Sequence, residues 1–336
     1  MFEQLRLFGE LTGATREHPL LRPIGMTPVL IVELDADGLK IEKVLENAAI
    51  LRAEGVHAIS VADSPSANIR MDSMYVAHRI ETDAGISAIP HLTVRDRNVL
   101  ALHGTLMAGA TMGLKAVLAL TGDGVKRSDL KAAGQKISRV TDVPNSNELI
   151  SLIRKLNHGR DILNRELGGR TDYVIGAGVN PNVLYFDKEV KRLERKIESG
   201  AQFAMSQILF STERIQLLYS KTRHLSVPIF AGLLPLLSVR NAKFLQQRMF
   251  EVPDLVMQRL EAAGSEPSQV RAAGLAICKD LVPSILKAGA PGFYLVCPKG
   301  RIELILELLS CIRSHLGLWH RTRDRDGEFG SAAAGD

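Results

Sequence analysis

The 336-residue sequence has only three cysteines and no long uncharged apolar run. Cys278, Cys297 and Cys311 are too few and too scattered for a disulfide framework or a C-x-x-C metal site. We therefore expect no metal centre and a reducing, cytoplasmic setting. A membrane-spanning helix needs about 18 consecutive apolar residues, which the sequence lacks, and the first residues carry acids rather than the apolar run of a signal peptide. These absences argue against a membrane protein and against a disulfide-rich secreted domain.

Positive charge exceeds negative charge only slightly, with a net charge of +5. The basic residues are mixed with acids along stretches such as 188–196, rather than gathered in a basic tail or in an arm with interleaved aromatic residues. Nucleic-acid-binding domains concentrate their Lys and Arg residues in such patches. The pattern therefore argues against a nucleic-acid partner and leaves an anionic cofactor or substrate to be considered.

Short apolar runs recur along the chain, and each is followed by a segment with helical periodicity. This alternation predicts repeated strand–helix units around a parallel sheet that is buried on both faces. The predicted strands are 29–35, 58–62, 88–93, 116–121, 173–179, 203–210, 228–233 and 292–297. The predicted helices are 39–53, 68–78, 97–108, 148–157, 187–199, 212–222, 239–248, a pair within 254–289, and 302–316.

Eight such units favour a single closed (β/α)8 TIM barrel over an open, doubly wound sheet. Glycines follow five of the predicted helices, where a left-handed residue ends a helix; they are Gly55, Gly85, Gly113, Gly200 and Gly289. The first strand is not followed by a G-x-G-x-x-G motif, which counts against a Rossmann domain. We predict an N-terminal extension (1–27), one barrel domain (28–316) and a flexible, polar tail (317–336).

Chemistry in such barrels takes place where the strands end, so polar residues at these positions are informative. Glu33 interrupts the apolar strand V-L-I-V-E-L-D. A buried carboxylate is costly unless it is paired, so Glu33 is either functional or part of a strand-end salt bridge. A carboxyl group in apolar surroundings has a raised pKa, which suits a general acid.

Two other strand ends carry candidate ligand-binding groups. Asp123 follows the apolar strand A-V-L-A-L-T, between Gly122 and Gly124, which permit a ligand to approach the backbone closely. A turn-forming aspartate flanked by glycines explains the same pattern equally well. Gln207 interrupts the apolar run F-A-M-S-Q-I-L-F, where we expect a buried amide that needs hydrogen-bonding partners.

The remaining candidates are one histidine and one helix face. A lone histidine is more often a satisfied core residue than a functional group, but His91 ends a strand beside the charged stretch R-D-R. Glu189, Arg192 and Lys196 share a helix face at i, i+3 and i+7. Such a face is usually solvated, but it can also hold the phosphates or ribose of a nucleotide. From these residues we predict an α/β-barrel enzyme with a small polar ligand.

Several motifs, in this order, carry a resemblance to a known family: H-L-T-V-R-D-R-N, L-A-L-T-G-D, G-A-G-V-N-P-N, K-R-L-E-R-K-I-E-S-G-A-Q-F-A-M-S-Q and P-I-F-A-G-L-L-P-L. The chain resembles the flavin-dependent methylenetetrahydrofolate reductases. It resembles still more closely the reductase half of bifunctional proteins that join this reductase to a homocysteine methyltransferase. The likeness runs from about residue 28 to residue 316, and it includes no methyltransferase half.

The resemblance implies an FAD-containing barrel that passes a hydride from NADH or NADPH, through flavin N5, to the methylene carbon of methylenetetrahydrofolate. It implies that Glu33 protonates folate N10, that Asp123 stabilises the resulting cation and tunes the flavin, and that Gln207 binds the folate. The FAD contacts that it implies are His91, Gly122, Asp123, Glu189, Arg192, Arg195 and Lys196. We expect a homo-oligomer, with a separate methyltransferase or electron-transfer protein as a candidate partner.

The chain departs from the family pattern at three places. Ala62 lies in V-A-D-S-P, where many members have a Thr-Tyr-Gly turn, and Thr121 replaces the arginine that usually precedes G-D. Val239 stands where an aromatic residue stacks on the nicotinamide. These changes leave open a second hypothesis, a flavin-free barrel that binds folate for methyl transfer or as a partner subunit. A third hypothesis, a nucleic-acid-binding protein, is supported by the positive charge alone.

Overall fold

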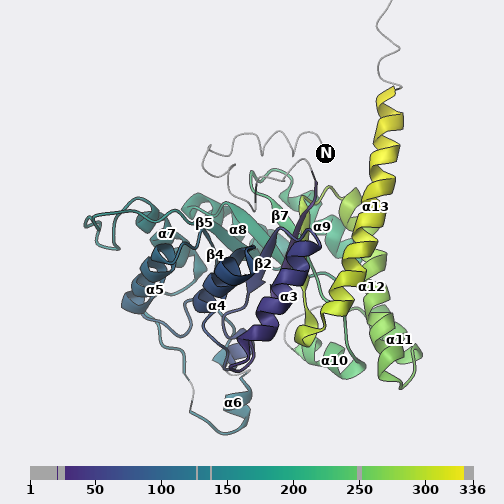
Figure 1. The fold of residues 1–336 in the computed structure, drawn as a ribbon, viewed down its shortest axis with the longest axis horizontal. Coiled ribbons are helices and arrows are strands. Elements are labelled where there is room, and N and C mark those ends of the chain that lie inside the picture. Colours follow the sequence, from purple (N-terminus) through teal and green to yellow (C-terminus); the bar gives the residue numbers. More distant parts are fainter. Residues whose placement is uncertain (1–20, 22–26, 126–127, 137, 248–251, 329–336) are drawn as a thin grey trace, which may run out of the picture.

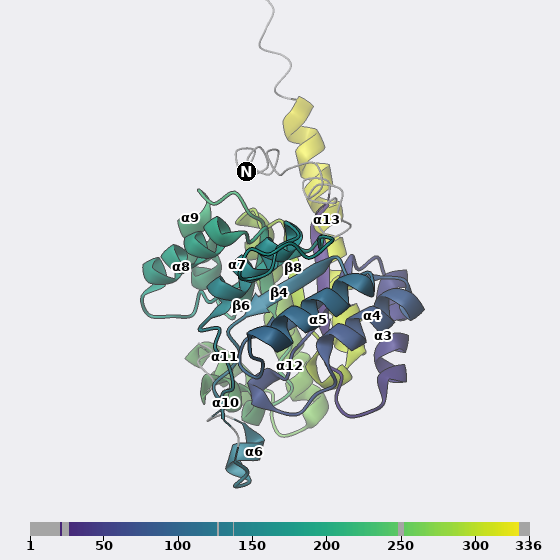
Figure 2. The ribbon, with the colours of Figure 1, turned by 90° about the vertical axis from the view of Figure 1, so that its left-hand side faces the viewer.

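The chain folds into a closed barrel of eight parallel strands surrounded by helices (Figure 1, Figure 2). The structure, a computed structural model, describes residues 21, 27–125, 128–136, 138–247 and 252–328. The strands are β1 (Val29–Leu34), β2 (Ala58–Val61), β3 (Ser87–Thr93), β4 (Ala116–Leu120), β5 (Val174–Val179), β6 (Phe203–Ile208), β7 (Ile229–Leu233) and β8 (Gly292–Val296). The predicted (β/α)8 barrel is confirmed, and every predicted strand end lies within two residues of the observed one.

Alternate strand positions point into the barrel and fill it with apolar side chains. The interior cluster consists of Leu21, Val29, Ile31, Ala58, Ile89, Ala116, Leu118, Val174, Phe203, Met205, Phe230 and Tyr294. Gly176 lacks a side chain where the Phe203 ring needs the space, because a Cβ there would lie 2.3 Å from Phe203 Cζ. The barrel is therefore a packed core, and its polar interior residues lie toward the C-terminal ends of the strands.

The helices form an outer layer that packs on the strands. They are α3 (Ile41–Ala53), α4 (Ser73–Arg79), α5 (Val99–Thr111), α6 (Asp129–Ala132), α7 (Ser146–Asn157), α8 (Phe186–Ser199), α9 (Thr212–Thr222), α10 (Val239–Gln247), α11 (Asp254–Ala262), α12 (Pro267–Lys287) and α13 (Ile302–Glu328). The five glycines expected to end helices all have positive φ, from 64° at Gly85 to 128° at Gly200. Within the described residues, no helix combines the length and apolarity that crossing a membrane requires.

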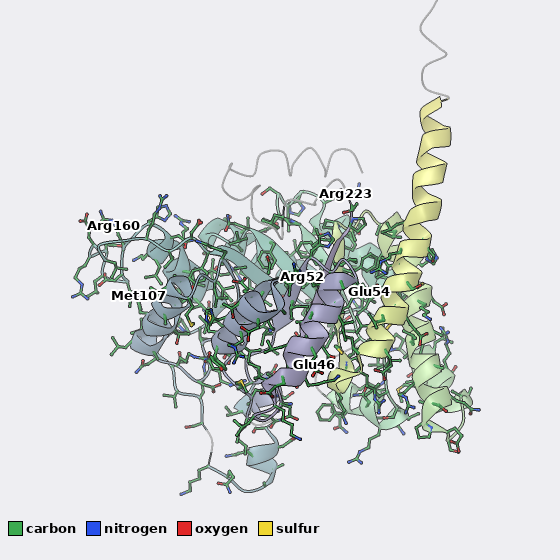
Figure 3. The ribbon with its side chains drawn as sticks, in the orientation of Figure 1. Glu46, Arg52, Glu54, Met107, Arg160 and Arg223 are labelled. Atoms are coloured by element: carbon green, nitrogen blue, oxygen red, sulfur yellow. The ribbon has the colours of Figure 1, made fainter. Side chains whose placement is uncertain are left out.

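Exposed charged side chains lie on these helices and on the loops between them, as Glu46 of α3 and Arg160, after α7, do in Figure 3. Many basic residues pair with a neighbouring acid; for example, Arg313 Nη1 lies 2.8 Å from Glu54 Oε2. Acids and bases are thus interspersed over the outer layer, as the mixed charge of the sequence predicts.

Some boundaries differ from the prediction. α4 begins at Ser73 rather than at residue 68, because Asp72 accepts hydrogen bonds from the first amides of this helix. α13 runs on to Glu328, so residues 317–328 are helical rather than a flexible tail. Their sequence contains no proline and places arginine and aspartate three residues apart, which favours a helix. Residues 329–336, and all of the predicted extension 1–27 except Leu21 and Thr27, lie outside the described residues.

Candidate active site

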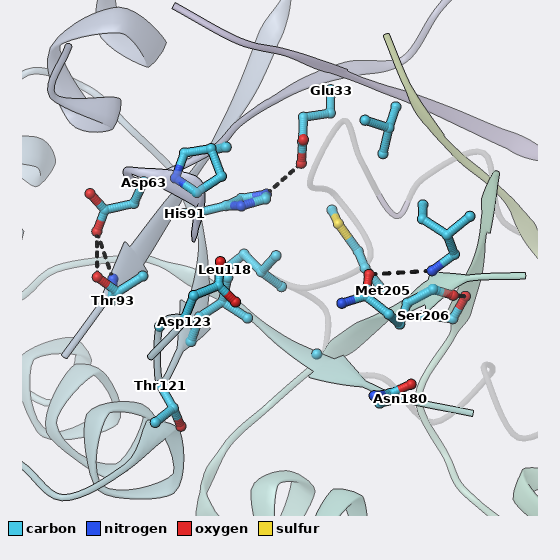
Figure 4. Close-up of a pocket in the computed structure, with 18 of the residues that line it drawn as sticks. Glu33, Asp63, His91, Thr93, Leu118, Thr121, Asp123, Asn180, Met205 and Ser206 are labelled. Atoms are coloured by element: carbon cyan, nitrogen blue, oxygen red, sulfur yellow. Dashed lines mark hydrogen bonds and ion pairs between the residues drawn. The ribbon is translucent and has the colours of Figure 1, made fainter. Parts of the chain in front are cut away.

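A cavity of about 450 Å³ lies at the C-terminal ends of the barrel strands (Figure 4). Its wall contains most of the residues that the sequence singles out: Glu33, His91, Gly122, Asp123, Glu189, Lys196 and Gln207. Arg192 and Arg195 are exposed on α8, outside this wall. The fold thus brings the two predicted catalytic carboxylates, the predicted amide and five of the seven predicted cofactor contacts, Asp123 among them, to one place.

Glu33 reaches into the cavity from β1, with 15% of its side chain exposed. The hydroxyl group of Tyr294 on β8 donates a hydrogen bond to Glu33 Oε2. Burial raises the pKa of Glu33 from 4.5 to about 7; the Tyr294 hydrogen bond opposes this rise, and the charges of Asp35 and Asp123 add to it. The raised pKa expected from the sequence is confirmed. At neutral pH the carboxyl group can therefore both hold and release a proton.

His91 is buried beside Glu33, with its Nε2 3.7 Å from Glu33 Oε2 (Figure 4) and 2.5 Å from Ser60 Oγ. Burial lowers the pKa of His91 to about 4, against the opposing charge of Asp63. Because His91 is charged only below about pH 4 and Glu33 only above about pH 7, the two are not charged together. This contact is therefore not the strand-end salt bridge that the sequence left open for Glu33.

Glu33, Ser60, His91 and Tyr294, hereafter the buried quartet, form a continuous polar group inside the barrel. Burial, and then the neighbouring Glu33 charge, raise the pKa of Tyr294, so its hydroxyl remains a hydrogen-bond donor. The sequence analysis missed Ser60 and Tyr294, because a serine and a tyrosine in apolar strands resemble core residues. Strand register was the available signal: Ser60 pairs with Glu33, and Tyr294 lies two residues before Val296, the partner of Glu33 on β8.

Asp123 lies just after β4 and is exposed to the cavity. The preceding Gly122 has a φ of +85°, and a Cβ there would lie 2.9 Å from the Cβ of Arg95, so only glycine fits. Asp123 Oδ2 accepts a hydrogen bond of 2.6 Å from the backbone N–H of Ser66. Ser66 itself has a positive φ of 57°, an unfavourable conformation for a residue with a side chain. The Asp123 carboxylate thus holds a strained loop while facing the cavity.

Gln207 also faces the cavity, but it is exposed, so the expectation of a buried amide is wrong. It is the penultimate residue of β6, at the C-terminal end of the strand. Its Oε1 accepts a hydrogen bond of 3.3 Å from the adjacent Ile208 N–H. Asn180, which follows β5, is half-buried in the same wall. We call Asp123, Asn180 and Gln207 the open wall.

The charged face of α8 divides into a buried part and an exposed part. Glu189 is buried, accepts a hydrogen bond of 3.2 Å from Asn180 N and lies 3.2 Å from Arg192 Nη1. Lys196 Nζ donates to Gly178 O at 2.6 Å, and burial lowers its pKa against the opposing charge of Glu189. Lys196 is half-buried and bonded to a backbone carbonyl, unlike a lysine on a solvated helix face, so Glu189 and Lys196 belong to the cavity wall whereas Arg192 and Arg195 lie outside it.

The departures from the family pattern have structural consequences. Asp63 follows Ala62 in the cavity wall, and its Oδ2 accepts hydrogen bonds from Thr93 N at 2.8 Å (Figure 4) and from Arg97 Nη1 at 2.6 Å. Thr121 Oγ1 accepts a hydrogen bond of 3.1 Å from Ser146 N, at the start of α7. Asp63 and Thr121 therefore make contacts that fix the loops around the cavity.

The aromatic residue on α10 that lines the cavity is Phe244 rather than a residue at position 239. Val239 instead packs against an apolar cluster beneath α10. Among the described residues, no group of three or more His, Cys, Asp or Glu side chains is placed to hold a metal ion. The cavity thus combines carboxyl, amide and ammonium groups with an aromatic face, a composition suited to a planar, polar organic ligand.

Comparisons with known proteins point to one family. The sequence model described as methylenetetrahydrofolate reductase matches residues 39–310. Methylenetetrahydrofolate reductase 1 of Schizosaccharomyces pombe is 22% identical over 249 residues, which cover 72% of this chain and 38% of that protein. The 5,10-methylenetetrahydrofolate reductase of Pectobacterium carotovorum is 22% identical over 245 residues, which cover 70% of this chain and 73% of that protein.

A solved structure has the same fold. It is an uncharacterized protein from Clostridium thermocellum that binds two copies of 5-methyl-5,6,7,8-tetrahydrofolic acid. Its TM-score is 0.56 at 16% sequence identity, with 86% of this chain and 97% of that chain covered. The present chain spans only 33% to 38% of the length of the Schizosaccharomyces pombe and Caenorhabditis elegans relatives.

Proposed function

We propose, from the premise that this chain belongs to the methylenetetrahydrofolate reductase family, that it reduces 5,10-methylenetetrahydrofolate to 5-methyltetrahydrofolate with FAD and with NADH or NADPH as hydride donor. The observation that carries this proposal is the Glu33 carboxyl group, which lines the cavity with a pKa of about 7. Reduction of the methylene bridge requires an acid that protonates a folate nitrogen as the ring opens. A carboxyl group poised near neutral pH can serve as that acid.

The chain's own residues would divide the proton chemistry as follows. Glu33 holds the proton at its carboxyl group and delivers it to folate N10. Tyr294 orients that carboxyl group through its hydrogen bond to Oε2. Asp123, whose carboxylate faces the same cavity, stabilises the cation that forms when the ring opens. The apolar barrel interior beneath the cavity keeps water away from Glu33.

The residues of the cavity fit FAD on structural grounds. Arg95 Nη1 is buried without a hydrogen-bond partner, and the Lys196 amine is largely desolvated; both would gain from the oxygen atoms of a flavin nucleotide. The residues that would hold FAD are His91, Gly122, Asp123, Glu189, Arg192, Arg195 and Lys196. Bound FAD would supply the hydride relay between the nicotinamide and the folate.

The open wall and Phe244 suit the folate. Gln207 offers both a donor and an acceptor to a pterin ring, which has amide-like edges. Phe244, 42% exposed on the cavity wall, offers an aromatic face to a planar ring. The related fold from Clostridium thermocellum binds a methylated tetrahydrofolate, which supports a folate as the ligand here.

The absorbance spectrum of the purified protein tests the proposal. We expect a yellow protein whose flavin absorbance is bleached anaerobically by NADH or NADPH and is restored by methylenetetrahydrofolate. A colourless protein that neither binds added FAD nor oxidises a nicotinamide would contradict it.

One observation favours a second candidate, a flavin-free barrel that binds folate for methyl transfer or as a partner subunit. The carboxylate of Asp123 is already engaged by the Ser66 N–H, beside a strand end where Thr121 replaces an arginine. Equilibrium dialysis with 5-methyltetrahydrofolate separates the candidates. Tight folate binding by a protein that takes up no FAD would select the flavin-free barrel.

A further inference from the structure

Arg95 is an arginine of the cavity wall that is almost completely buried, at 2% exposure. Its Nε donates to both carboxylate oxygens of Asp96, at 2.8 and 2.9 Å, and its Nη2 donates to Ser64 O at 3.1 Å. Its remaining nitrogen, Nη1, is buried and has no hydrogen-bond partner. Three buried side-chain atoms in the described part of the chain lack a partner, and of the three residues that carry them Arg95 is the one that lines the cavity.

A buried N–H group without an acceptor is costly, and native proteins satisfy such groups with a protein atom, a water molecule or a ligand. Asp96 already neutralises the guanidinium charge, so what Arg95 offers is a directed donor rather than a free positive charge. The complementary group is an oxygen atom that carries a negative or partial negative charge.

The location of Arg95 indicates which ligand supplies that oxygen. The stem of Arg95 packs against Gly122, where an added Cβ would lie 2.9 Å from Arg95 Cβ. Arg95 is therefore adjacent to the turn formed by Gly122 and Asp123, one of the proposed cofactor contacts.

We propose that Arg95 is a cofactor-binding residue that donates a hydrogen bond from Nη1 to an oxygen of the bound flavin nucleotide. This inference rests on the proposed function, because it assumes that the cavity binds FAD.

Flavin affinity, measured by titration of FAD fluorescence or absorbance with the apoprotein, tests the inference directly and without turnover. Arg95→Met should weaken FAD binding by about ten- to a hundredfold, the usual effect of losing a hydrogen bond from a charged donor. Arg95→Lys should weaken it too, because one ammonium group cannot reproduce the guanidinium fork that serves Asp96 and the ligand together. The lysine variant keeps the charge, so it provides the test if the methionine variant does not fold.

Arg70→Met is the matched control. Arg70 Nε also donates to both oxygens of an aspartate, Asp35, at 2.7 and 2.9 Å, but Arg70 lies outside the cavity wall. This variant should keep the wild-type affinity for FAD. Circular dichroism checks that each variant is folded.

Riboflavin locates the contact. Weaker binding of FAD alone places Arg95 against the diphosphate or ribose, and weaker binding of both places it against the flavin ring; either result supports the inference. Folded Arg95 variants that bind FAD as the wild type does would overturn the inference and leave the proposed function intact. A wild-type chain that does not bind FAD would overturn both.

Discussion

The two sides of the cavity are built differently. On the side of β1, β2, β3 and β8, the buried quartet forms direct contacts between its own side chains, and burial raises the pKa of Glu33 to about 7 and lowers that of His91 to about 4. On the open wall, Asp123 and Gln207 are exposed, and each accepts a hydrogen bond from a backbone N–H group. The first side is preset by the fold, whereas the second leaves donors and acceptors facing a ligand.

This difference suggests a division of labour. Side chains that hold one another in a desolvated interior have their proton affinities fixed before a ligand arrives. Side chains that face solvent retain the freedom to pair with the ligand. Substitutions in the quartet should therefore change chemistry and pH dependence, and substitutions on the open wall should change binding.

The largest effect is expected from Glu33→Gln, which removes the proposed acid. Methylenetetrahydrofolate reduction should fall by about a hundred- to ten-thousandfold, the usual contribution of a general acid, while flavin reduction by the nicotinamide remains nearly intact. Anaerobic stopped-flow absorbance separates the two half-reactions. Glu81→Gln is a matched control, because burial also raises the pKa of Glu81 but that residue lies outside the cavity. Equal losses in both half-reactions would reject the assignment of Glu33.

Glu33 should also make stability depend on pH. Its pKa is about 7 in the fold against an ordinary 4.5, so between these values the folded state binds more protons than the unfolded state. The free energy of unfolding therefore falls as the pH rises, and the loss is complete above about pH 7. The shift corresponds to about 3 kcal/mol. In urea unfolding without folate, the free energy of unfolding of Glu33→Gln relative to that of the wild type should rise by up to this amount between pH 5 and pH 8. A difference between the two proteins that does not change with pH would contradict a buried acid at position 33.

The sequence predicts the barrel well because each parallel strand is buried on both faces and reads as an apolar run between polar segments. The helix predicted over 212–222 is confirmed at both ends, and Ser211 caps its first turn. The sequence does not predict the late start of α4, because that start depends on the capping hydrogen bonds that the Asp72 side chain accepts. It does not predict the length of α13 either, because the polar, aperiodic segment after residue 316 indicates a flexible tail rather than a helix.

For the site, the sequence predicts the polar residues that interrupt apolar strands, and Glu33, His91 and Gln207 all line the cavity. It does not predict Tyr294, because the role of this residue depends on the closure of β8 against β1, a contact between residues 261 positions apart. The local sequence pattern also does not predict the exposure of a side chain: the amide of Gln207 interrupts an apolar run and is nevertheless open to the cavity.

An intermediate effect is expected on the open wall. Gln207→Leu should raise the dissociation constant for folate by about tenfold, through the loss of one or two hydrogen bonds, without shifting the pH midpoint of the folate half-reaction. Fluorescence titration with folate checks the affinity. Gln246→Leu is the control, because Gln246, on α10, donates to Val252 O and is not part of the cavity wall. A shift of the pH midpoint in Gln207→Leu would show that the two sides are not independent.

The smallest effects should come from two substitutions that move the pKa of Glu33 in opposite directions. The hydrogen bond from Tyr294 lowers this pKa, so Tyr294→Phe should raise the pH midpoint of the folate half-reaction. The charge of Asp123 raises the same pKa and is the weakest of its causes, so Asp123→Asn should lower the midpoint slightly. Rates measured from pH 5 to pH 9 give both midpoints. Shifts of the same sign would mean that Tyr294 acts on Glu33 through packing rather than through its hydroxyl group. If instead Asp123→Asn moves the midpoint as far as Tyr294→Phe does, the open wall sets the proton affinity as strongly as the quartet, and the division between the two sides fails.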